Sequence, residues 1–238
     1  MHDFVSGLSD PVRAEFESLC TETLYPRGAV IYANGDAPRA MYRLVEGAIK
    51  LCNFTIDGNE VLAGEFRPGD CFGEMSLVDG LPRNSNTIAV AECRVAVLSF
   101  QDFNLLRKKH REFGDQLMFM LCLRLRYMHA YAEEALGFPL RVRLARILHR
   151  LAYTHGTPVP AADTLSVEIS HEDLGKMTGS TRQSVSRELK SLEQEGVIEL
   201  SYGRVVIADM QNLAERYEAA TGVEQLAPAY GSAKFSES

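Results

Sequence analysis

The segment "HEDLGKMTGSTRQSVSRELKSLEQEGVIELSYGRVVI", residues 171–207, decides the fold of the C-terminal part of this chain. Ser170 followed by Asp173 is typical of a capping box, so it predicts a short helix that runs through Met177. Gly179 can adopt the left-handed backbone conformation. The segment therefore begins with a short helix that ends in a tight turn.

A second helix is predicted directly after that turn. Ser180 with Gln183 is a second capping signature, and an apolar stripe at i, i+4 and i+7 follows it, formed by Val185, Leu189 and Leu192. Glu195-Gly196 ends the helix, and residues 197–200 and 205–207 are predicted to pair as a two-stranded wing. Gly175, which has no side chain, suits a close crossing of the two helices. The pattern predicts a winged helix-turn-helix, whose second helix can enter the DNA major groove.

The polar face of the second helix carries groups that recognise nucleic acid. Arg182 and Arg187 present planar forks that match guanine O6 and N7, and Gln183 can pair with adenine. Hydroxyl groups are suited to phosphate contacts, which position a protein on DNA without specifying sequence, and they are supplied by Ser180, Thr181, Ser184 and Ser186. The alternative is a solvated surface helix.

Composition permits two domains. The chain has 238 residues, 46% of them hydrophobic, and a formal net charge of −7, which argues against nonspecific coating of nucleic acid but not against a local DNA-reading surface. Residues 140–150 contain four arginines and no acidic residue, namely Arg141, Arg143, Arg146 and Arg150. These arginines are predicted either to contact the DNA backbone or to form a solvated helix face.

The N-terminal part has a different texture. Residues 1–20 have apolar residues at helical spacing, and from Arg27 to about Phe100 short apolar runs alternate with glycine turns. Such spacing predicts an antiparallel β-roll or jelly roll. The chain is therefore assigned to the α+β class.

A heptad seam follows the β-rich region. Apolar residues recur at alternating spacings of three and four, at Met118, Leu121, Leu125, Met128, Ala132 and Ala135. The seam predicts a dimerisation helix, although a helix packed on its own β-roll would show the same pattern. Gly137-Phe138-Pro139 interrupts it and is predicted to be a hinge. The domains are then 1–109 (sensor), 110–137 (dimerisation helix) and 138–221 (DNA-binding), with a disordered tail at 222–238.

Other classes of protein fit poorly. No apolar run approaches the roughly 20 residues needed to span a membrane, and the start has no secretory signal pattern. The five scattered cysteines include no CxxC pair, so no disulfide framework or zinc site is expected and a cytoplasmic location fits best. Residues 3–109 contain no histidine, which argues against haem and against a metal-dependent enzyme, and Cys20 alone cannot bind an iron–sulfur cluster.

Two motifs in order carry a resemblance to a known family. "RPGDCFGEMSLVDGLPRNSNTIAVAECRVAVL", residues 67–98, followed by a long helix and residues 171–198, resembles the CRP/FNR family of bacterial transcription regulators over about residues 10–210. The resemblance implies a homodimer with a β-roll of the cyclic-nucleotide-binding type and a winged helix-turn-helix. It also implies double-stranded DNA and RNA polymerase as partners, and no enzymatic activity.

The resemblance extends to an effector site. Gly73, Glu74 and Arg83 match the family's phosphate-binding cassette, so Arg83 would pair with a cyclic phosphate and Glu74 would accept a hydrogen bond from a ribose hydroxyl. Asn84 stands where cyclic-AMP-responsive members usually carry serine or threonine, and Ser85 where they carry alanine. The match at Gly73, Glu74 and Arg83 implies that the effector is a cyclic nucleotide, cyclic AMP or cyclic GMP. The alternative is a turn in an effector-free roll.

The base-contacting residues of the predicted second helix also depart from the family pattern. Arg182, Gln183 and Arg187 take the base-contacting positions, but glutamate commonly occupies the middle one. The expected half-site is related to TGTGA and altered at the pair that glutamate would read. On the long helix, the hydroxyl pair that reads adenine in cyclic-AMP-responsive members falls near Tyr127-Met128-His129, where Met128 cannot donate a hydrogen bond and His129 can.

The leading hypothesis is a homodimeric, effector-gated DNA-binding regulator. A constitutive regulator whose roll is only a dimerisation scaffold is the first alternative. A small-molecule-binding or enzymatic jelly roll with an incidental helical domain is the second.

Overall fold

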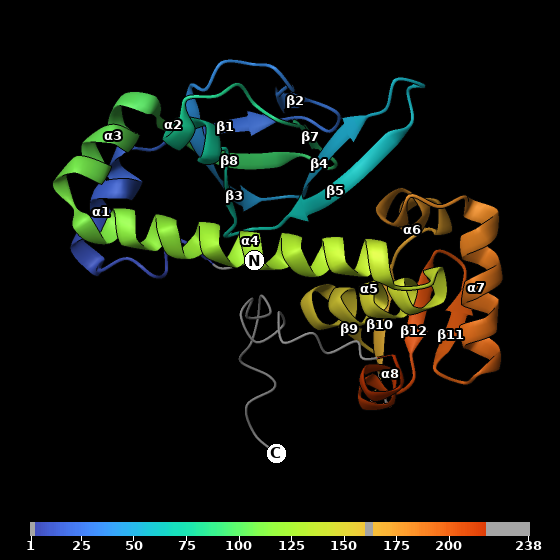
Figure 1. Ribbon diagram of the computed structural model, residues 1–238. Helices are drawn as coiled ribbons and strands as arrows, with labels where there is room; N and C mark the ends of the chain where they lie inside the picture. Colours follow the sequence, from blue (N-terminus) through green and yellow to red (C-terminus); the bar gives the residue numbers. More distant parts are fainter. Residues whose placement is uncertain (1–2, 160–163, 218–238) are drawn as a thin grey trace. The chain divides into compact units, whose positions relative to one another are not determined.

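The computed structural model describes residues 3–159 and 164–217 (Figure 1). Contacts between residues divide the chain into two compact units that meet at Cys122 and Leu123. The helix α4 (Arg111–Gly137) belongs to both units, the first part of it to the N-terminal unit and the rest to the C-terminal unit. The tail predicted at 222–238 lies outside the described residues.

The N-terminal unit is a β-roll with helices at one end (Figure 1). Two four-stranded antiparallel sheets have the strand orders β1-β8-β3-β6 and β2-β7-β4-β5. This confirms the predicted roll. Its elements besides α4 are α1 (Asp10–Leu19), β1 (Thr21–Tyr25), β2 (Val30–Tyr32), β3 (Ala40–Glu46), β4 (Ile49–Phe54), β5 (Glu60–Phe66), β6 (Cys71–Phe72), α2 (Met75–Asp79), β7 (Asn86–Ala89), β8 (Cys93–Ser99) and α3 (Phe100–Lys109).

Aromatic side chains fill the space between the two sheets. The Phe72 ring stacks on those of Tyr42 and Phe66, with centroid distances of 5.2 and 4.7 Å. A second cluster packs α1, α3 and the start of α4 together around Phe16, Phe103 and Phe113, which are buried. Stacked and edge-to-face rings are favourable arrangements for aromatic side chains. The first cluster stabilises the roll from the inside, and the second packs these helices against β3, β6 and β8.

Two elements of this unit were not predicted. β1 begins at Thr21, before the predicted β-rich region, and α2 interrupts that region. β1 lies at the edge of its sheet and its side chains are exposed or half-buried, so it lacks the apolar alternation of a strand with one buried face. Pairing with β8, about 70 residues later in the chain, decides its conformation.

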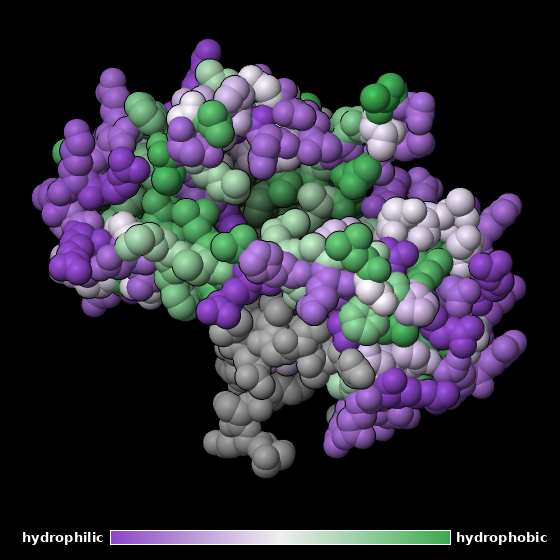
Figure 2. All heavy atoms as spheres, viewed as in Figure 1, coloured by the Kyte–Doolittle hydropathy of each residue, from purple (hydrophilic) through white to green (hydrophobic). Residues whose placement is uncertain are grey.

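Most of the seam lies on an open face of α4. Met118, Leu125 and Met128 are 58%, 56% and 52% exposed, while Leu121 is half-buried against the core of the N-terminal unit. That core is reached mainly by other residues of the helix, such as Phe113 and Leu117. The packing of α4 on its own roll therefore leaves most of the seam uncovered. Figure 2 shows hydrophobic side chains among the surface atoms along α4.

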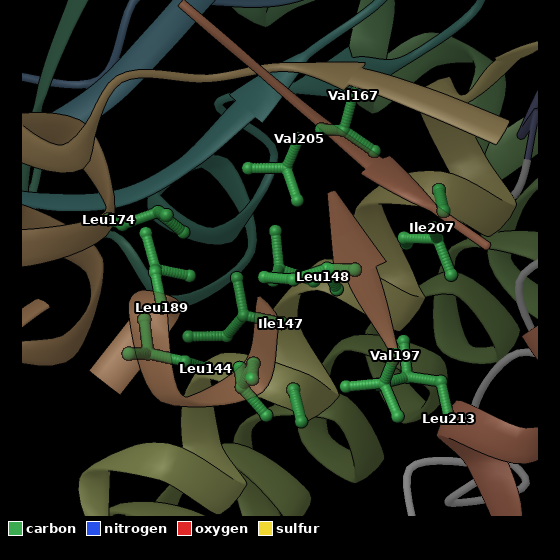
Figure 3. Close-up of a cluster of buried hydrophobic side chains, with 14 of the residues drawn as sticks. Leu144, Ile147, Leu148, Val167, Leu174, Leu189, Val197, Val205, Ile207 and Leu213 are labelled. Atoms are coloured by element: carbon green, nitrogen blue, oxygen red, sulfur yellow. The ribbon is translucent and has the colours of Figure 1, made fainter. Parts of the chain in front are cut away.

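The C-terminal unit is a winged helix-turn-helix built on α5. A four-stranded antiparallel sheet has the order β11-β12-β10-β9. Side chains from α5, α6, α7 and the sheet converge on one core (Figure 3). Besides the end of α4, the elements are α5 (Leu140–His155), β9 (Thr157–Pro158), β10 (Leu165–Glu168), α6 (His171–Thr178), α7 (Arg182–Gln194), β11 (Ile198–Ser201), β12 (Arg204–Ile207) and α8 (Met210–Arg216).

The two predicted helices and their turn are confirmed, with one correction. Ser170 caps α6 by accepting a hydrogen bond from the Asp173 backbone N–H, and Gly179 has a φ of 62°. A Cβ on Gly175 would lie 2.7 Å from the Ser180 carbonyl oxygen, so the close crossing requires glycine there. The capping of α7 by Ser180 was predicted wrongly. Thr181 is the cap, and its side chain accepts from the Ser184 backbone N–H.

β9, β10 and α8 were not predicted from the sequence. β9 and β10 extend the wing hairpin into a four-stranded sheet, in which β10 pairs with β12 about 40 residues later. The segment before Ser170 contains a glycine and two prolines and reads locally as a loop. Only the edge offered by β12 makes part of it a strand.

Candidate nucleic-acid interface and sensor site

α7 separates its two faces completely. Val185, Leu189 and Leu192 have no exposed surface and lie in the core of the C-terminal unit. On the opposite face Arg182 and Gln183 are exposed, and the Arg187 side chain is 76% exposed. The structure thus brings the predicted base-reading side chains onto one open helix face, supported by a rigid core on the other.

Some of the hydroxyl groups near the start of α7 form hydrogen bonds within the protein. The Thr181 and Ser184 hydroxyls lie 3.0 Å apart and hydrogen-bond within the cap, and the Ser180 hydroxyl donates to the Thr178 carbonyl oxygen at 3.4 Å. The half-buried Ser186 lies further along the helix. These hydroxyls can still accept or share bonds with phosphate, but the cap bonds hold Thr181 and Ser184 in place first.

A shallow groove runs along α7 and shows polar residues that sequence reasoning did not select. Lys190 and Gln194 line it together with Gln183 and Arg187. Their spacing of three or four residues from one another places them on one face, and that periodicity could have revealed them. The pKa of His171, at the start of α6, is lowered by burial and then by the positive charges of Arg182 and Lys190. The groove is lined by the basic side chains of Arg187 and Lys190 and also by the carboxylate of Glu188.

The arginines of α5 bond inside the C-terminal unit. Arg150 forms a bidentate pair with Glu134 at 2.6 and 2.9 Å, and Arg146 lies 3.6 Å from the same carboxylate. Arg141 donates to Glu188 at 3.1 Å, and Arg143 donates to a backbone carbonyl of α6 at 3.0 Å. The predicted solvated face is wrong for Arg146 and Arg150, which are nearly buried, whereas the Arg141 side chain is 41% exposed. The internal bonds of the four arginines argue against the predicted phosphate contacts.

In the β-roll the structure brings Gly73 and Arg83 together. The Arg83 side chain is buried and donates to the Gly73 carbonyl oxygen and, at 2.6 Å, to that of Ala40. Its guanidinium lies 4.5 Å from the centroid of the Tyr32 ring, a cation–π contact. Gly73 has a φ of 82°, and a Cβ there would lie 3.0 Å from Arg83 Nη1. The glycine permits the approach of this guanidinium.

The other two sensor residues lie beside this pair in different environments. Glu74 has no exposed surface, whereas Asn84 is exposed and its carbonyl oxygen accepts from the Asn53 side chain at 2.9 Å. Asn84 follows Arg83 directly in the chain but is exposed, so it is not part of the buried cluster.

The cysteines of the chain are all free thiols. Burial raises the pKa of the Cys20 thiol to about 12, so this thiol is a poor nucleophile. Among the described residues no group of three or more histidine, cysteine or acidic side chains is placed to hold a metal ion. In the same residues no helix has the length and apolar character that a membrane span requires.

Comparisons with known proteins agree with this architecture. Residues 22–110 match the cyclic nucleotide-binding domain, and residues 142–216 match the Crp-like helix-turn-helix domain. The chain is 33% identical to the transcriptional regulator LdrP of Thermus thermophilus over 79% of this chain and 93% of that protein. It is 28% identical to a CRP-like cAMP-activated global transcriptional regulator of Mycobacterium tuberculosis, over 81% of this chain and 86% of that protein.

A solved structure of a CRP-family transcriptional regulator from Thermus thermophilus superimposes with a TM-score of 0.67 at 30% identity. The match covers 82% of this chain and 96% of that one.

Proposed function

The chain belongs to the CRP/FNR family of transcription regulators, and from that premise we propose that it binds a palindromic DNA site as a homodimer whose affinity is controlled by a cyclic nucleotide in the β-roll. The family consists of transcription regulators rather than enzymes. RNA polymerase is the proposed protein partner, and the cytoplasm, where bacterial DNA lies, is the proposed location.

The single observation that carries the DNA-binding part is the division of α7 into two faces. Three leucine and valine side chains anchor it in the core, while Arg182, Gln183 and Arg187 project from the open side. A helix held this way can enter the major groove and present its side chains to base edges. The basic side chains of Arg182, Arg187 and Lys190 favour approach to phosphate.

A genomic binding selection tests this proposal. Purified protein is mixed with fragmented genomic DNA, with and without cyclic AMP, cyclic GMP or cyclic di-GMP, and the bound fragments are sequenced. The expected result is a palindrome with half-site centres about 34 Å apart, one turn of B-form DNA. Recovery of DNA without any common sequence would overturn the proposal.

Gln183 is proposed to set one base pair of the half-site. Glutamine does not reproduce the acceptor-only edge with which a glutamate binds cytosine N4. Gln183→Glu is therefore expected to move the selected half-site toward TGTGA at a single position. The control is Gln194→Glu on the same helix face, about three turns further on, which is expected to leave that position unchanged.

The homodimer is proposed to form through the seam on α4. Met118, Leu125 and Met128 are exposed on the separate chain, and an a/d seam of this kind is buried when two helices pair. Leu125→Glu places a charge in each half of that contact, so it is expected to yield monomers in analytical ultracentrifugation. Leu136→Glu, at a residue that is 91% exposed and off the seam, is the matched control and is expected to remain dimeric.

The residues of the β-roll fit a cyclic nucleotide. Arg83 Nε is buried and makes no hydrogen bond to any residue that the structure describes, so the guanidinium retains donor capacity beyond its two carbonyl bonds. Arg83 would hold the cyclic phosphate and Glu74 a ribose hydroxyl, with Gly73 leaving room at the backbone. When bound, the nucleotide supplies a negative charge that Arg83 can pair with.

A second candidate is a constitutive regulator without an effector. It is favoured by the two carbonyl bonds of Arg83, which give this residue a structural role in the roll. Calorimetric titration with cyclic AMP, cyclic GMP and cyclic di-GMP separates the two candidates. Binding of one nucleotide that Arg83→Met abolishes supports the gated regulator. Absence of heat with all three, together with unchanged DNA binding, supports the constitutive one.

A further inference from the structure

Two carbonyl groups at the end of α6 accept hydrogen bonds from side chains outside the helix-turn-helix, and one of them, that of Thr178, also accepts from Ser180 within it. The Tyr131 hydroxyl, on α4, donates to the Met177 carbonyl oxygen at 2.8 Å, and Arg143 Nη1, on α5, donates to the Thr178 carbonyl oxygen at 3.0 Å. The last carbonyls of a helix have no partner within it. The two donors therefore fix the point where α6 meets the turn that leads into α7.

The end of α4 is also tied to α5. Glu134 is buried and receives the bidentate pair from Arg150, and Arg146 packs its guanidinium 4.0 Å from the centroid of the Phe138 ring. A buried, paired and hydrogen-bonded charge resists separation, because the partner left behind would be unpaired. The contacts of Arg150 with Glu134 and of Arg146 with Phe138 thus connect the two helices across the Gly137-Phe138-Pro139 break, which was predicted to be a hinge.

The part of α4 that belongs to the C-terminal unit carries four of the six residues of the proposed dimer seam. Leu125 and Met128 are exposed, and Ala132 lies exposed next to Tyr131 in the chain. Successive residues of an α-helix are about 100° apart around its axis, so the seam and the contacts to α6 lie on adjacent faces of one helix. All of these residues belong to the C-terminal unit.

We propose that Tyr131 and Arg143 are positioning residues that set the placement of the recognition helix α7 relative to the dimer seam, and so determine which half-site spacing the protein accepts. This inference rests on the proposed dimer. Two copies of α7 must meet successive major grooves, and one added base pair turns a half-site by about 34° around the DNA axis. If the turn before α7 is held in place, the protein binds poorly to a site whose second half-site is rotated. If the turn is loosened, α7 can adjust and the rotated site is bound better.

The test compares spacing preference in matched variants. Tyr131→Phe removes only the hydroxyl, Arg143→Lys keeps the charge but loses the guanidinium fork, and Tyr153→Phe is the control at an exposed tyrosine of α5. The probes are duplexes with the half-site selected by the wild type, at the selected spacing and with one base pair added or removed. Affinity is measured by fluorescence anisotropy in the full chain.

The wild type and Tyr153→Phe are expected to discriminate the three spacings equally. Tyr131→Phe is expected to lose about threefold to tenfold in affinity at the selected spacing, which is the net contribution of one hydrogen bond, and to lose less at the other two. The ratio between spacings then falls. A merely stabilising role would lower the melting temperature and leave that ratio unchanged.

Two results overturn different statements. If both variants keep the wild-type spacing ratio, the positioning role is wrong while the proposed function stands. If the wild type itself shows no preference among the three spacings or binds as a monomer, the proposed dimeric function fails. A fall of the spacing ratio in either variant supports the positioning role of the residue that was changed, since the two donors act on neighbouring carbonyls.

Discussion

Two helices of the C-terminal unit are rich in arginine, and they use it in opposite ways. On α7, Arg182 and Arg187 project from the open face, where Arg187 Nε lies 3.4 Å from Glu188 Oε1 but the side chain stays 76% exposed. On α5, the Arg146 and Arg150 side chains are 8% and 12% exposed and are bonded within the unit. The comparison teaches that an arginine on a helix stays exposed, and so available to DNA, only where the acidic and carbonyl partners inside the fold do not bury its guanidinium group.

The largest expected effect is on the free energy of unfolding, when the buried partner of the α5 arginines is replaced. Glu134→Gln leaves the Arg146 and Arg150 guanidinium groups buried beside a neutral amide, which is expected to lower the free energy of unfolding by about 3–5 kcal/mol. The chain contains no tryptophan, so urea unfolding is followed by circular dichroism. Glu133→Gln, at the exposed neighbour, is the control. A change below about 0.5 kcal/mol, the range for surface substitutions, would contradict the structural role of the α5 arginines.

The opposite result is expected on α7. Arg182→Ala or Arg187→Ala is expected to reduce specific DNA affinity by about 1–3 kcal/mol and to relax one base position each, because a bidentate contact to a base edge is lost. The unfolding free energy should change by less than about 0.5 kcal/mol. Arg111→Ala, where the side chain is 94% exposed in the N-terminal unit, controls for the loss of one positive charge. An unchanged sequence logo after either α7 substitution would refute the assignment.

A smaller effect distinguishes the two helices by salt dependence. Affinity for DNA falls with salt concentration in proportion to the number of phosphates neutralised. Lys190→Ala is expected to reduce the slope of log affinity against log salt by about 1 if Lys190 contacts phosphate. Arg141→Gln is expected to leave the slope unchanged, since Arg141 is bonded to Glu188 and Glu195. A reduced slope for Arg141→Gln would indicate that Arg141 contacts DNA phosphate and that α5 is part of the DNA interface.

The smallest expected effect is on acid stability. The pKa of Glu195 is lowered by the hydrogen bond from Tyr217 and then by the charges of Arg216 and Arg141. A lowered carboxylate pKa contributes stability that is present above the unfolded value of 4.5 and is lost as pH falls through the lower folded value. Because Glu195 is partly exposed, the contribution is below about 1 kcal/mol. Glu195→Gln should flatten urea-unfolding stability between about pH 5 and about pH 3, relative to wild type. If Glu195→Gln has the same dependence of unfolding free energy on pH as the wild type, the Glu195 carboxylate does not contribute to acid stability.

The helix-turn-helix could be predicted almost residue by residue because its signals are local. Ser170 with Asp173, Gly179 and the stripe from Val185 to Leu192 all act over a few residues, and the structure confirms each. The cap of α7 was misplaced by one residue. Ser180 and Thr181 are adjacent hydroxyl residues with similar capping ability, and only the path of the turn decides between them.

Elements whose partners are distant could not be predicted in the same way. β1 pairs with a strand that lies about 70 residues away, and β10 with one about 40 residues away. Neither has a strong apolar alternation of its own over enough residues to be recognised. Their strand conformation results from the hydrogen-bonding edge that another part of the chain offers.

The sequence by itself determined the order of the domains, the two-faced recognition helix and the seam on α4, since periodicity and capping depend on neighbours along the chain. Only the tertiary structure decided where the arginines go. The partners of Arg141, Arg143 and Arg150 lie 16 to 54 residues away, so their bonds exist only once the chain has folded. A guanidinium group carries the same charge in both settings, and its surroundings alone decide whether it is bonded inside the fold or stays exposed on a helix face.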